Sequence, residues 1–374
     1  MKNILLIFIV VMGLLPACNT QNKTTSQTAG KDTLPVKFYK RFEGTIAGKP
    51  VVMHLHKTNN KYEGVYYYRN IGRWLYLNGD SISGNTILFI EIADAYNEYS
   101  DQDTLHAQLD CKFIGDSLSG TWQSADRKTS YPINLKEVYP TGTYRFSIEE
   151  FSDSLKAFPA KEGTPMAELN FSFVRADDNN WINNEIKRII GFDSTLNFNE
   201  GFTKKRNEYF ADYKKELPPA LDSNDVQRYN YSETQNIYVR YNENDLVILE
   251  SADYIYSGGV HGNYGSTFYC YDIAAKKQLH LPDVLSADSV TMQQIMEKYF
   301  RIQYNVKEDS LNQVLFENHL AANQNFYFTE KGIGFLYNPY EVASYAQGEI
   351  SVFIPFTELQ KYLQPSFKKR LKIN

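Results

Sequence analysis

Hydrophobic and polar residues alternate in short runs along residues 35–139 of the chain. Eight of these runs are rich in β-branched and aromatic residues, and turns that carry Gly, Asn or Asp separate them. The eight runs are 42–46, 50–58, 62–70, 74–82, 86–93, 104–113, 118–124 and 130–138. Regular short strands with such turns predict an antiparallel all-β domain, either a small barrel or a sandwich.

Three glycines recur inside these strand-like runs. Gly44, Gly64 and Gly120 each stand directly before a β-branched residue. Because glycine inside a strand marks a bend or a close approach of two backbones, we expect these positions to lie where a small barrel curls.

The periodicity changes after the turn-forming residues 139–142, so we place a domain boundary between residues 139 and 140. Runs with helical spacing are found at 180–190, 202–217, 289–304, 310–320 and 356–363. Strand-like runs are found at 167–174, 229–240, 246–256, 268–273, 278–281, 326–337 and 350–354. Because helices and strands are grouped rather than strictly alternating, we predict an α+β domain over 140–374, with a first part at 140–250 and a second at 251–365.

The first residues have the pattern of an export signal. Lys2 precedes an apolar run at 4–15 that is too short for a comfortable membrane span, and the run ends in Leu15-Pro16-Ala17-Cys18. This end resembles the lipobox of bacterial lipoproteins, which implies cleavage before Cys18 and acylation of its thiol. We therefore expect a signal peptide at 1–17, followed at 18–34 by a lipidated cysteine and a flexible polar tether. The alternative is an ordinary secretory signal with a chance cysteine.

The lipobox resemblance implies a protein of the cell envelope that a lipid on Cys18 anchors to the membrane. No acidic cluster follows Cys18. In Bacteroidetes-type lipoproteins such a cluster marks export to the outer face. We therefore favour the periplasmic face of the outer membrane over the cell surface.

Composition excludes some classes of function and of site. The 374 residues carry a net charge of −5 and no basic stripe, which excludes nucleic acid as a partner. After Cys18 only Cys111 and Cys270 remain, and we favour buried free thiols in separate domains over an oxidised pair. The six histidines form no dense ligand cluster and no phosphate-binding loop is present, so we predict no metal and no cofactor.

Two groups of residues in the first domain have two interpretations each. His54 and His56 share one face of a strand and are able to hold a metal ion together, but no third ligand accompanies them, so we favour a polar, solvent-facing strand edge. Trp74, Trp122 and the tyrosines at 66–68 are able to stack on sugar rings, but aromatic residues of an all-β domain more often fill its core, which we favour.

Two separated segments of the second domain share a pattern with a known family. The first holds a Gly-Gly-x-His-Gly turn at 258–262 between aromatic strand-like runs, and continues through Tyr271-Asp272 to 281–285. The second runs from 326 to 356 and includes Tyr337-Asn338-Pro339-Tyr340-Glu341. In this order, over roughly 167–363, the chain resembles the RsiV-like C-terminal domain family (domain of unknown function 3298, with the preceding PdaC/RsiV-type segment). Where that family usually reads Ala-Pro-Tyr, this chain has Ala343-Ser344-Tyr345.

The resemblance implies an extracytoplasmic α+β domain, found in a lysozyme-sensing anti-sigma factor and beside a peptidoglycan deacetylase domain. In the anti-sigma factor the domain binds lysozyme directly. The present sequence shows no sigma-binding segment, no transmembrane helix and no deacetylase metal motif. We therefore expect neither the sensing circuit nor the deacetylase activity to transfer.

A Ser-His-acid triad can be drawn from Ser257, His261 and Glu341. These residue types are common in any chain, so we favour a role for His261 in holding the glycine turn through nearby backbone. Glu341 lies between Tyr340 and Tyr345, where it is either a buried carboxylate with a perturbed pKa or an acceptor of backbone hydrogen bonds in a long loop. We favour the second interpretation.

Together these patterns predict a non-catalytic, ligand-binding protein of the cell envelope, whose ligand is a lysozyme-like protein or peptidoglycan. One alternative is an envelope glycan hydrolase or deacetylase-like enzyme with an unrecognised site. Another is a structural lipoprotein that docks a second envelope protein. The candidate binding residues are Ser257, Gly258, Gly259, His261, Gly262, Tyr340, Glu341, Tyr345 and Gln347.

Overall fold

The computed structural model of the chain describes residues 34–58, 61–93, 106–220, 226, 228–307 and 310–373. The predicted signal peptide, Cys18 and nearly all of the predicted tether lie outside the described residues. Among the residues that are described, no helix has both the length and the apolar character needed to cross a membrane.

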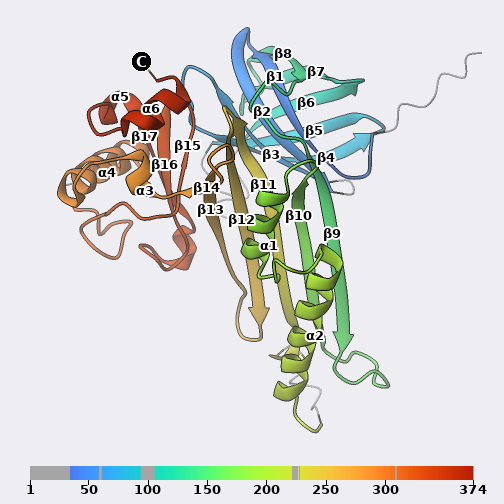
Figure 1. Cartoon of the computed structure of the whole chain (residues 1–374). Coiled ribbons are helices and arrows are strands. Elements are labelled where there is room, and N and C mark those ends of the chain that lie inside the picture. Colours follow the sequence, from blue (N-terminus) through green and yellow to red (C-terminus); the bar gives the residue numbers. More distant parts are fainter. Residues whose placement is uncertain are drawn as a thin grey trace, which may run out of the picture. The chain divides into compact units, whose positions relative to one another are not determined.

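Eight antiparallel strands form a closed barrel in the order β1 to β8 (Figure 1). They are β1 (Phe38–Ile46), β2 (Lys49–Thr58), β3 (Lys61–Tyr68), β4 (Leu75–Ser83), β5 (Thr86–Ile92), β6 (Ala107–Ile114), β7 (Ser117–Gln123) and β8 (Ser130–Glu137). The barrel closes where β1 pairs with β8, with Phe42 opposite Glu137. All eight predicted strands are confirmed, and this closure selects the barrel over the sandwich.

The three recurring glycines lie where neighbouring barrel strands approach closely. A Cβ atom on Gly44 would lie 2.0 Å from the carbonyl oxygen of Asn134, and one on Gly120 would lie 2.0 Å from that of Asp110. A Cβ atom on Gly64 would lie 2.4 Å from a backbone oxygen as well. No side chain fits at such distances, so the expected close approach of backbones is confirmed.

A six-stranded sheet follows the barrel, in the order β14-β13-β12-β11-β10-β9. Its strands are β9 (Phe146–Lys156), β10 (Met166–Ala176), β11 (Tyr231–Glu243), β12 (Leu246–Ser257), β13 (Asn263–Asp272) and β14 (Lys277–Leu279). All neighbours are antiparallel except β10 and β11. The predicted boundary at 139/140 falls in the connection between β8 and β9, and β9 itself was not predicted.

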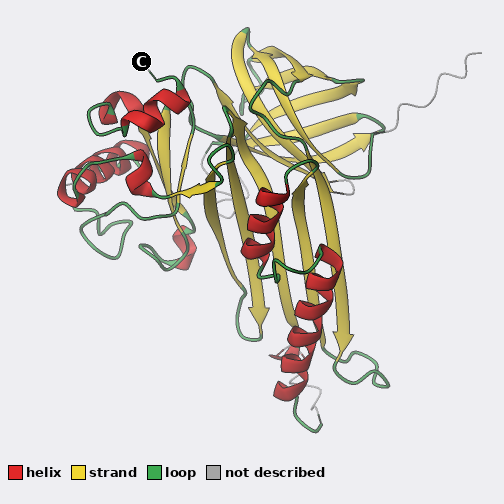
Figure 2. Ribbon diagram, viewed as in Figure 1, coloured by secondary structure: helices red, strands yellow, loops and turns green. Residues whose placement is uncertain are grey.

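Two helices, α1 (Asn180–Ile190) and α2 (Phe198–Glu216), cover one face of this sheet (Figure 2). The bounds of α1 match the prediction. Helix α2 begins four residues before the predicted start at 202, because Asn197 and Glu200 form a capping box in which each side chain bonds the backbone of the other. It ends before Pro218, as predicted.

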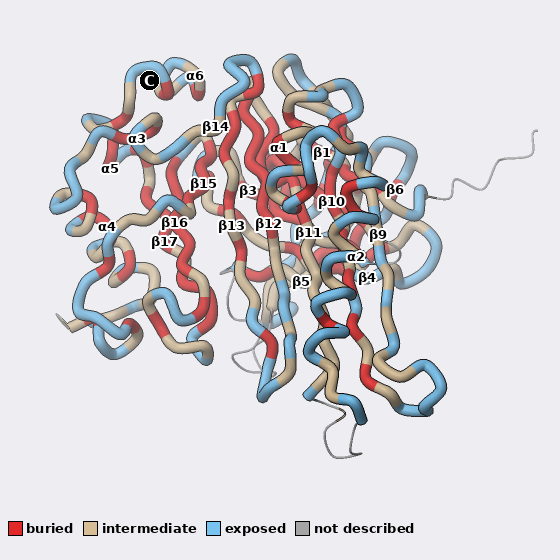
Figure 3. The backbone as a smooth tube through the Cα atoms, turned by 60° about the horizontal axis from the view of Figure 1, so that its bottom comes forward, coloured by how far each residue is buried: buried red, intermediate tan, exposed pale blue. Residues whose placement is uncertain are grey.

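The outer surface of the barrel packs against the opposite face of the same sheet, so that β2 and β3 are buried on both sides (Figure 3). The His56 ring lies against the Tyr238 ring of β11, with centroids 5.2 Å apart, and its Nε2 accepts a hydrogen bond from the Val239 amide at 3.0 Å. The Nδ1 atom of His54 forms a hydrogen bond of 2.9 Å with the hydroxyl group of Tyr39. Both histidines are almost fully buried, so the predicted solvent-facing strand edge is wrong.

A cluster of charged residues also joins the barrel to both sheets. Arg41 of β1 is fully buried and contacts Glu43 at 2.7 Å and Glu243 of β11 at 3.0 Å. Arg69 contacts Glu43 at 2.8 Å and Glu330, which precedes β16, also at 2.8 Å. These contacts lie within one compact unit, Leu34–Asn374.

A three-stranded sheet with short helices completes the chain. Its elements are α3 (Leu281–Val284), α4 (Ser289–Gln303), β15 (Phe326–Phe328), β16 (Gly332–Tyr337), β17 (Ile350–Pro355), α5 (Phe356–Leu359) and α6 (Pro365–Leu371). The predicted strand at 326–337 is a hairpin, and the predicted helix at 310–320 is wrong, because its described residues form turns and coil. Cys111 and Cys270 are buried free thiols, which confirms that prediction.

The aromatic residues of the first domain follow the core interpretation. Trp74 is buried and stacks on Tyr327 with ring centroids 3.7 Å apart, so it joins the barrel to the three-stranded sheet. Tyr66 and Tyr67 are fully buried. Trp122 is partly exposed, and its indole N–H donates to Glu91 at 2.8 Å.

Candidate functional site

The glycine turn at 258–262 joins β12 to β13 at the end of a long hairpin. Gly258 and Gly259 have φ angles of +84° and +108°, which favour glycine, and a Cβ on Gly258 would lie 2.2 Å from the Arg228 carbonyl oxygen. Gly262 is required for another reason, because a Cβ there would lie 2.4 Å from the Tyr254 ring. The φ angle is therefore positive at the first two glycines and not at the third.

His261 and Tyr345 both bind the carbonyl oxygen of Gly262. The His261 Nδ1 atom lies 2.8 Å from this oxygen and the Tyr345 hydroxyl donates to it at 3.1 Å. Since a carbonyl only accepts, Nδ1 must carry the proton of the His261 ring. The two rings also lie together, with centroids 4.2 Å apart. His261 thus bonds nearby backbone and holds the turn, as we favoured.

The loop after β16 holds the second segment in place. The side-chain oxygen of Asn338 accepts a hydrogen bond from the Ser266 amide of β13 at 2.7 Å, and its side-chain nitrogen donates to Glu341 at 3.2 Å. The Tyr340 amide donates to the Ala343 carbonyl at 3.0 Å, which closes a turn. Asn338 therefore ties this loop to the hairpin that carries the glycine turn.

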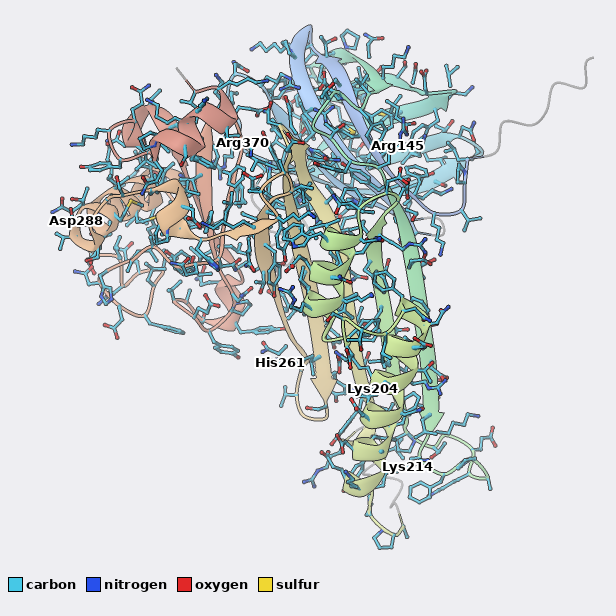
Figure 4. All side chains as sticks on the ribbon, in the orientation of Figure 1. Arg145, Lys204, Lys214, His261, Asp288 and Arg370 are labelled. Atoms are coloured by element: carbon cyan, nitrogen blue, oxygen red, sulfur yellow. The ribbon has the colours of Figure 1, made fainter. Side chains whose placement is uncertain are left out.

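These contacts bring together the two segments that the sequence separates by some eighty residues. We call the result the signature surface and define it as residues 254–262 with 338–347. Val260 is 100% exposed, Ile255 52%, Tyr340 54% and Tyr254 41%. Figure 4 labels His261 on the hairpin at the end of β12 and β13. The surface presents exposed apolar and aromatic side chains beside exposed polar ones such as Ser257 and Glu341, and hydrogen bonds fix its backbone.

The structure places every candidate binding residue of the sequence on or directly beside this surface. Ser257, Gly259, His261, Tyr340, Glu341 and Gln347 are exposed, whereas Gly258 and Tyr345 are partly buried and Gly262 is buried. Glu341 is exposed, so it is not a buried carboxylate. The favoured interpretation, in which Glu341 accepts hydrogen bonds from the backbone of a long loop, is not found either, because its side chain accepts from the Asn338 side chain.

The geometry does not assemble a catalytic triad or a metal centre from the described residues. No hydrogen bond joins Ser257, His261 and Glu341 to one another in the part of the chain that the structure describes, since His261 bonds Gly262 and Glu341 bonds Asn338. In the same residues no group of three or more His, Cys, Asp and Glu side chains is placed to hold a metal ion.

A buried carboxyl group lies next to the signature surface. Glu349 follows the loop directly and is 8% exposed, and it hydrogen-bonds Ser266. Burial and then the nearby charge of Glu250 raise the pKa of Glu349 to about 8, while Ser266 and Arg240 act in the opposite direction. Arg240 in turn contacts Glu250 and, at 2.6 Å, Glu63 of the barrel. A chain of buried charges thus leads from the signature surface to the barrel.

Sequence reasoning missed Tyr254, Ile255, Val260 and Glu349 as parts of this region. In the sequence, Tyr254 and Ile255 continue the strand-like run at 246–256, and nothing distinguishes them from an ordinary strand end. Glu349 gave one usable signal, because it stands directly before the aliphatic run of β17, where a charged residue is unusual.

Comparison with known proteins identifies the C-terminal part of the chain. Residues 281–357 match the family described as "Protein of unknown function (DUF3298)". The fold is similar to a DUF3298 family member from Bacteroides fragilis NCTC 9343, with 19% identity and a TM-score of 0.56, over 63% of this chain and 100% of that one. It is also similar to a DUF3298 family protein from Pseudomonas aeruginosa PAO1, with 19% identity and a TM-score of 0.42, over 59% and 95% of the two chains. A comparison with curated proteins gives no match.

At 19% identity, the similarity to the B. fragilis protein concerns the fold alone. The matched residues 281–357 contain α3, α4 and the three-stranded sheet, together with the loop half of the signature surface. The glycine turn precedes them. Residues 281–357 of this chain are therefore similar to the DUF3298 family, whose description assigns no function.

Proposed function

We propose that this chain is a lipid-anchored, non-catalytic protein of the cell envelope that binds a protein ligand at the signature surface. One observation carries the proposal: the exposed rings of His261 and Tyr340, from two distant segments, both pack on Tyr345, on a backbone that hydrogen bonds already hold in place. Exposed apolar patches mark interaction sites, and a preformed surface loses less conformational entropy on binding. The resemblance to RsiV-like domains makes a lysozyme-like enzyme the first ligand to test, and peptidoglycan the second.

We expect Val260→Asp and Tyr340→Ala each to weaken binding of hen egg-white lysozyme at least about tenfold, because both remove exposed apolar contact area from the signature surface. The measurement is the dissociation constant from biolayer interferometry with the purified full-length chain. Val290→Asp is the matched control, since Val290 is 65% exposed on α4, outside the signature surface.

Equal affinities of the Val260→Asp and Val290→Asp proteins would show that lysozyme binds elsewhere on the chain. If the unmodified protein does not bind lysozyme at about 10 μM, lysozyme is not the ligand. Co-sedimentation of the same variants with purified peptidoglycan then tests the second ligand at the same surface.

The anchor is tested separately, at Cys18. We expect Cys18→Ala to move the protein from the membrane fraction to the soluble fraction of its native cells, because the variant lacks the thiol that carries the lipid. Immunoblots of the two fractions measure the change. A Cys111→Ala variant, which removes a buried thiol instead, is expected to stay in the membrane fraction. Membrane association of Cys18→Ala equal to that of the unmodified chain would contradict the lipid anchor.

A further inference from the structure

A groove of about 690 Å³ lies between the outer surface of the barrel and the six-stranded sheet. Residues of β2 to β5 line one side of it, and residues of β9 to β11 line the other. Its volume is within the roughly 300–1,000 Å³ of ligand pockets in proteins. We call it the barrel–sheet groove. It shares no residue with the signature surface.

A buried, neutral histidine forms part of the wall of this groove. His56 lines the groove and is only 2% exposed. Burial and then the charge of Arg240 lower the pKa of His56 well below its usual value, against an opposing effect of the Glu63 main chain, so the ring is neutral. Because Nε2 accepts from the Val239 amide, the single ring proton is on Nδ1. This Nδ1 is buried away from solvent, so it is out of reach of a ligand, and His56 forms part of the fixed wall of the groove.

Four uncharged polar side chains also line the groove. They are Thr58, Asn78, Ser172 and Asn236. Ser172 and Asn236 lie opposite each other on β10 and β11, and Asn78 belongs to the barrel. None of the four side chains has a hydrogen-bond partner within the described part of the chain. Hydroxyl and carboxamide groups both donate and accept, so the groove offers converging groups of both kinds.

The charged side chains at the groove are already paired. Lys61 contacts Asp80 at 2.8 Å, and Glu63 contacts Arg240 at 2.6 Å. An ionic ligand would therefore meet charges that neutralise each other. This balance favours an uncharged ligand.

The remaining lining is largely aliphatic. Ile82, Leu88 and Ile90 come from the barrel, and Ile148 comes from β9. Such side chains pack on the C–H faces of a ligand while the polar groups bind its oxygens. A peptide cannot add a strand at Ser172 or Asn236, because at these positions β10 and β11 pair with each other and with β9 and β12.

From this arrangement we propose that the barrel–sheet groove binds a short uncharged oligosaccharide of about two or three rings. Sugar hydroxyls match the unpartnered Asn78, Ser172 and Asn236 side chains. The C–H faces of the rings pack on Leu88 and Ile90.

The test is isothermal titration of the full-length protein with maltotriose, cellotriose and tri-N-acetylchitotriose in separate experiments. We expect saturable binding of at least one of them. Asn236→Ala should weaken that binding at least about tenfold, since it removes two hydrogen-bonding atoms, and Ile90→Trp should abolish it by filling the groove. The matched control is Asn180→Ala at the start of α1, outside the groove lining, which should bind as the unmodified protein does.

Three results would each overturn the proposal. They are the absence of saturable binding by all three sugars up to about 10 mM, equal binding by Asn236→Ala and Asn180→Ala, and binding of tri-alanine but of no sugar. If Ile90→Trp lowers the melting temperature, Asn236→Ala decides, because its side chain makes no hydrogen bond to the described residues. Val260→Asp should leave sugar binding unchanged, which separates this site from the proposed protein-binding function.

Discussion

Raising the pH from about 5 to about 9 is expected to lower the free energy of unfolding of this protein, and Glu349→Gln is expected to remove much of that fall. Glu349 is 8% exposed next to Glu250, and its pKa is raised from the ordinary 4.5 to about 8. The folded protein therefore holds a proton on Glu349 over a range in which the unfolded chain has released it.

The direction of the effect follows from proton linkage. Below the unfolded pKa of Glu349 both states are protonated, and the stability is fully present. Between that value and about 8 the folded state binds more protons, so the free energy of unfolding falls by about 1.4 kcal/mol per pH unit for such a group. Above the folded pKa the loss is complete. The total is on the order of several kcal/mol, which is a large part of the stability of an ordinary domain.

A second carboxyl group with a raised pKa determines the pH range in which the unfolding is measured. Burial and then the charge of Glu243 raise the pKa of Glu330 to about 7, so Glu330 adds to the fall at lower pH only. Glu330 is present both in the unmodified protein and in Glu349→Gln, so the difference between the two proteins in urea unfolding at pH 7 and pH 8 isolates Glu349. Glu317→Gln, at an exposed position, is the control and should keep the full pH dependence. An unchanged difference between pH 7 and pH 8 in Glu349→Gln would show that Glu349 is not the titrating group.

The strands of the barrel could be predicted because each alternates and is bounded by turn residues. Alternation alone could not choose between a barrel and a sandwich, since both have the same period. It also could not show that β2 and β3 would be covered on both faces. His54 and His56 were therefore placed in solvent, whereas the six-stranded sheet buries them. The burial of a polar face by a distant part of the chain leaves no local signal.

Two errors in the second domain have similar causes. β9 escaped prediction because its apolar residues change face along the strand: Phe146 packs on Tyr39 of the barrel, whereas Phe151 packs on Phe202 of α2. The wrong helix at 310–320 has buried leucines at near-helical spacing. There the Asn318 side chain accepts from the Leu311 amide, at 2.6 Å, which holds a folded loop instead.

The pairing of the two signature segments was visible in the sequence only through their resemblance to a family. The structure shows the physical link, in which Asn338 binds Ser266 and Tyr345 binds Gly262. These bonds join side chains to backbone across some eighty residues, and no local pattern encodes them. The buried Glu349 beneath them depends on the same tertiary contacts.

The second large effect is expected at Arg240. Arg240→Met should lower the free energy of unfolding by about 3–5 kcal/mol, mainly the cost of leaving the buried Glu250 carboxylate without its partner. Arg240 is 1% exposed and contacts both Glu250, which is 5% exposed, and Glu63 of the barrel. Methionine keeps most of the side-chain volume, so the loss measures mainly the charge. Urea unfolding at pH 7 gives the difference.

The matched control is Arg175→Met. Arg175 contacts Glu149 at 2.8 Å, but the two side chains are 48% and 29% exposed. Water solvates the Glu149 carboxylate when Arg175 is replaced, so the expected loss in the free energy of unfolding is below about 1 kcal/mol. Equal losses in the two variants would show that burial does not strengthen the Arg240 pairs.

A double variant tests the cause directly. Adding Glu250→Gln to Arg240→Met removes one of the stranded carboxylates, so the double variant should be more stable than Arg240→Met alone. The same pair of variants links the two largest effects. The charge of Arg240 lowers the pKa of Glu349 and that of Glu250 raises it. Arg240→Met should therefore move the end of the pH-dependent fall above 8, and Glu250→Gln should move it back. If the fall in the free energy of unfolding ends at the same pH in both variants as in the unmodified protein, the buried charges between the barrel and the signature surface do not interact.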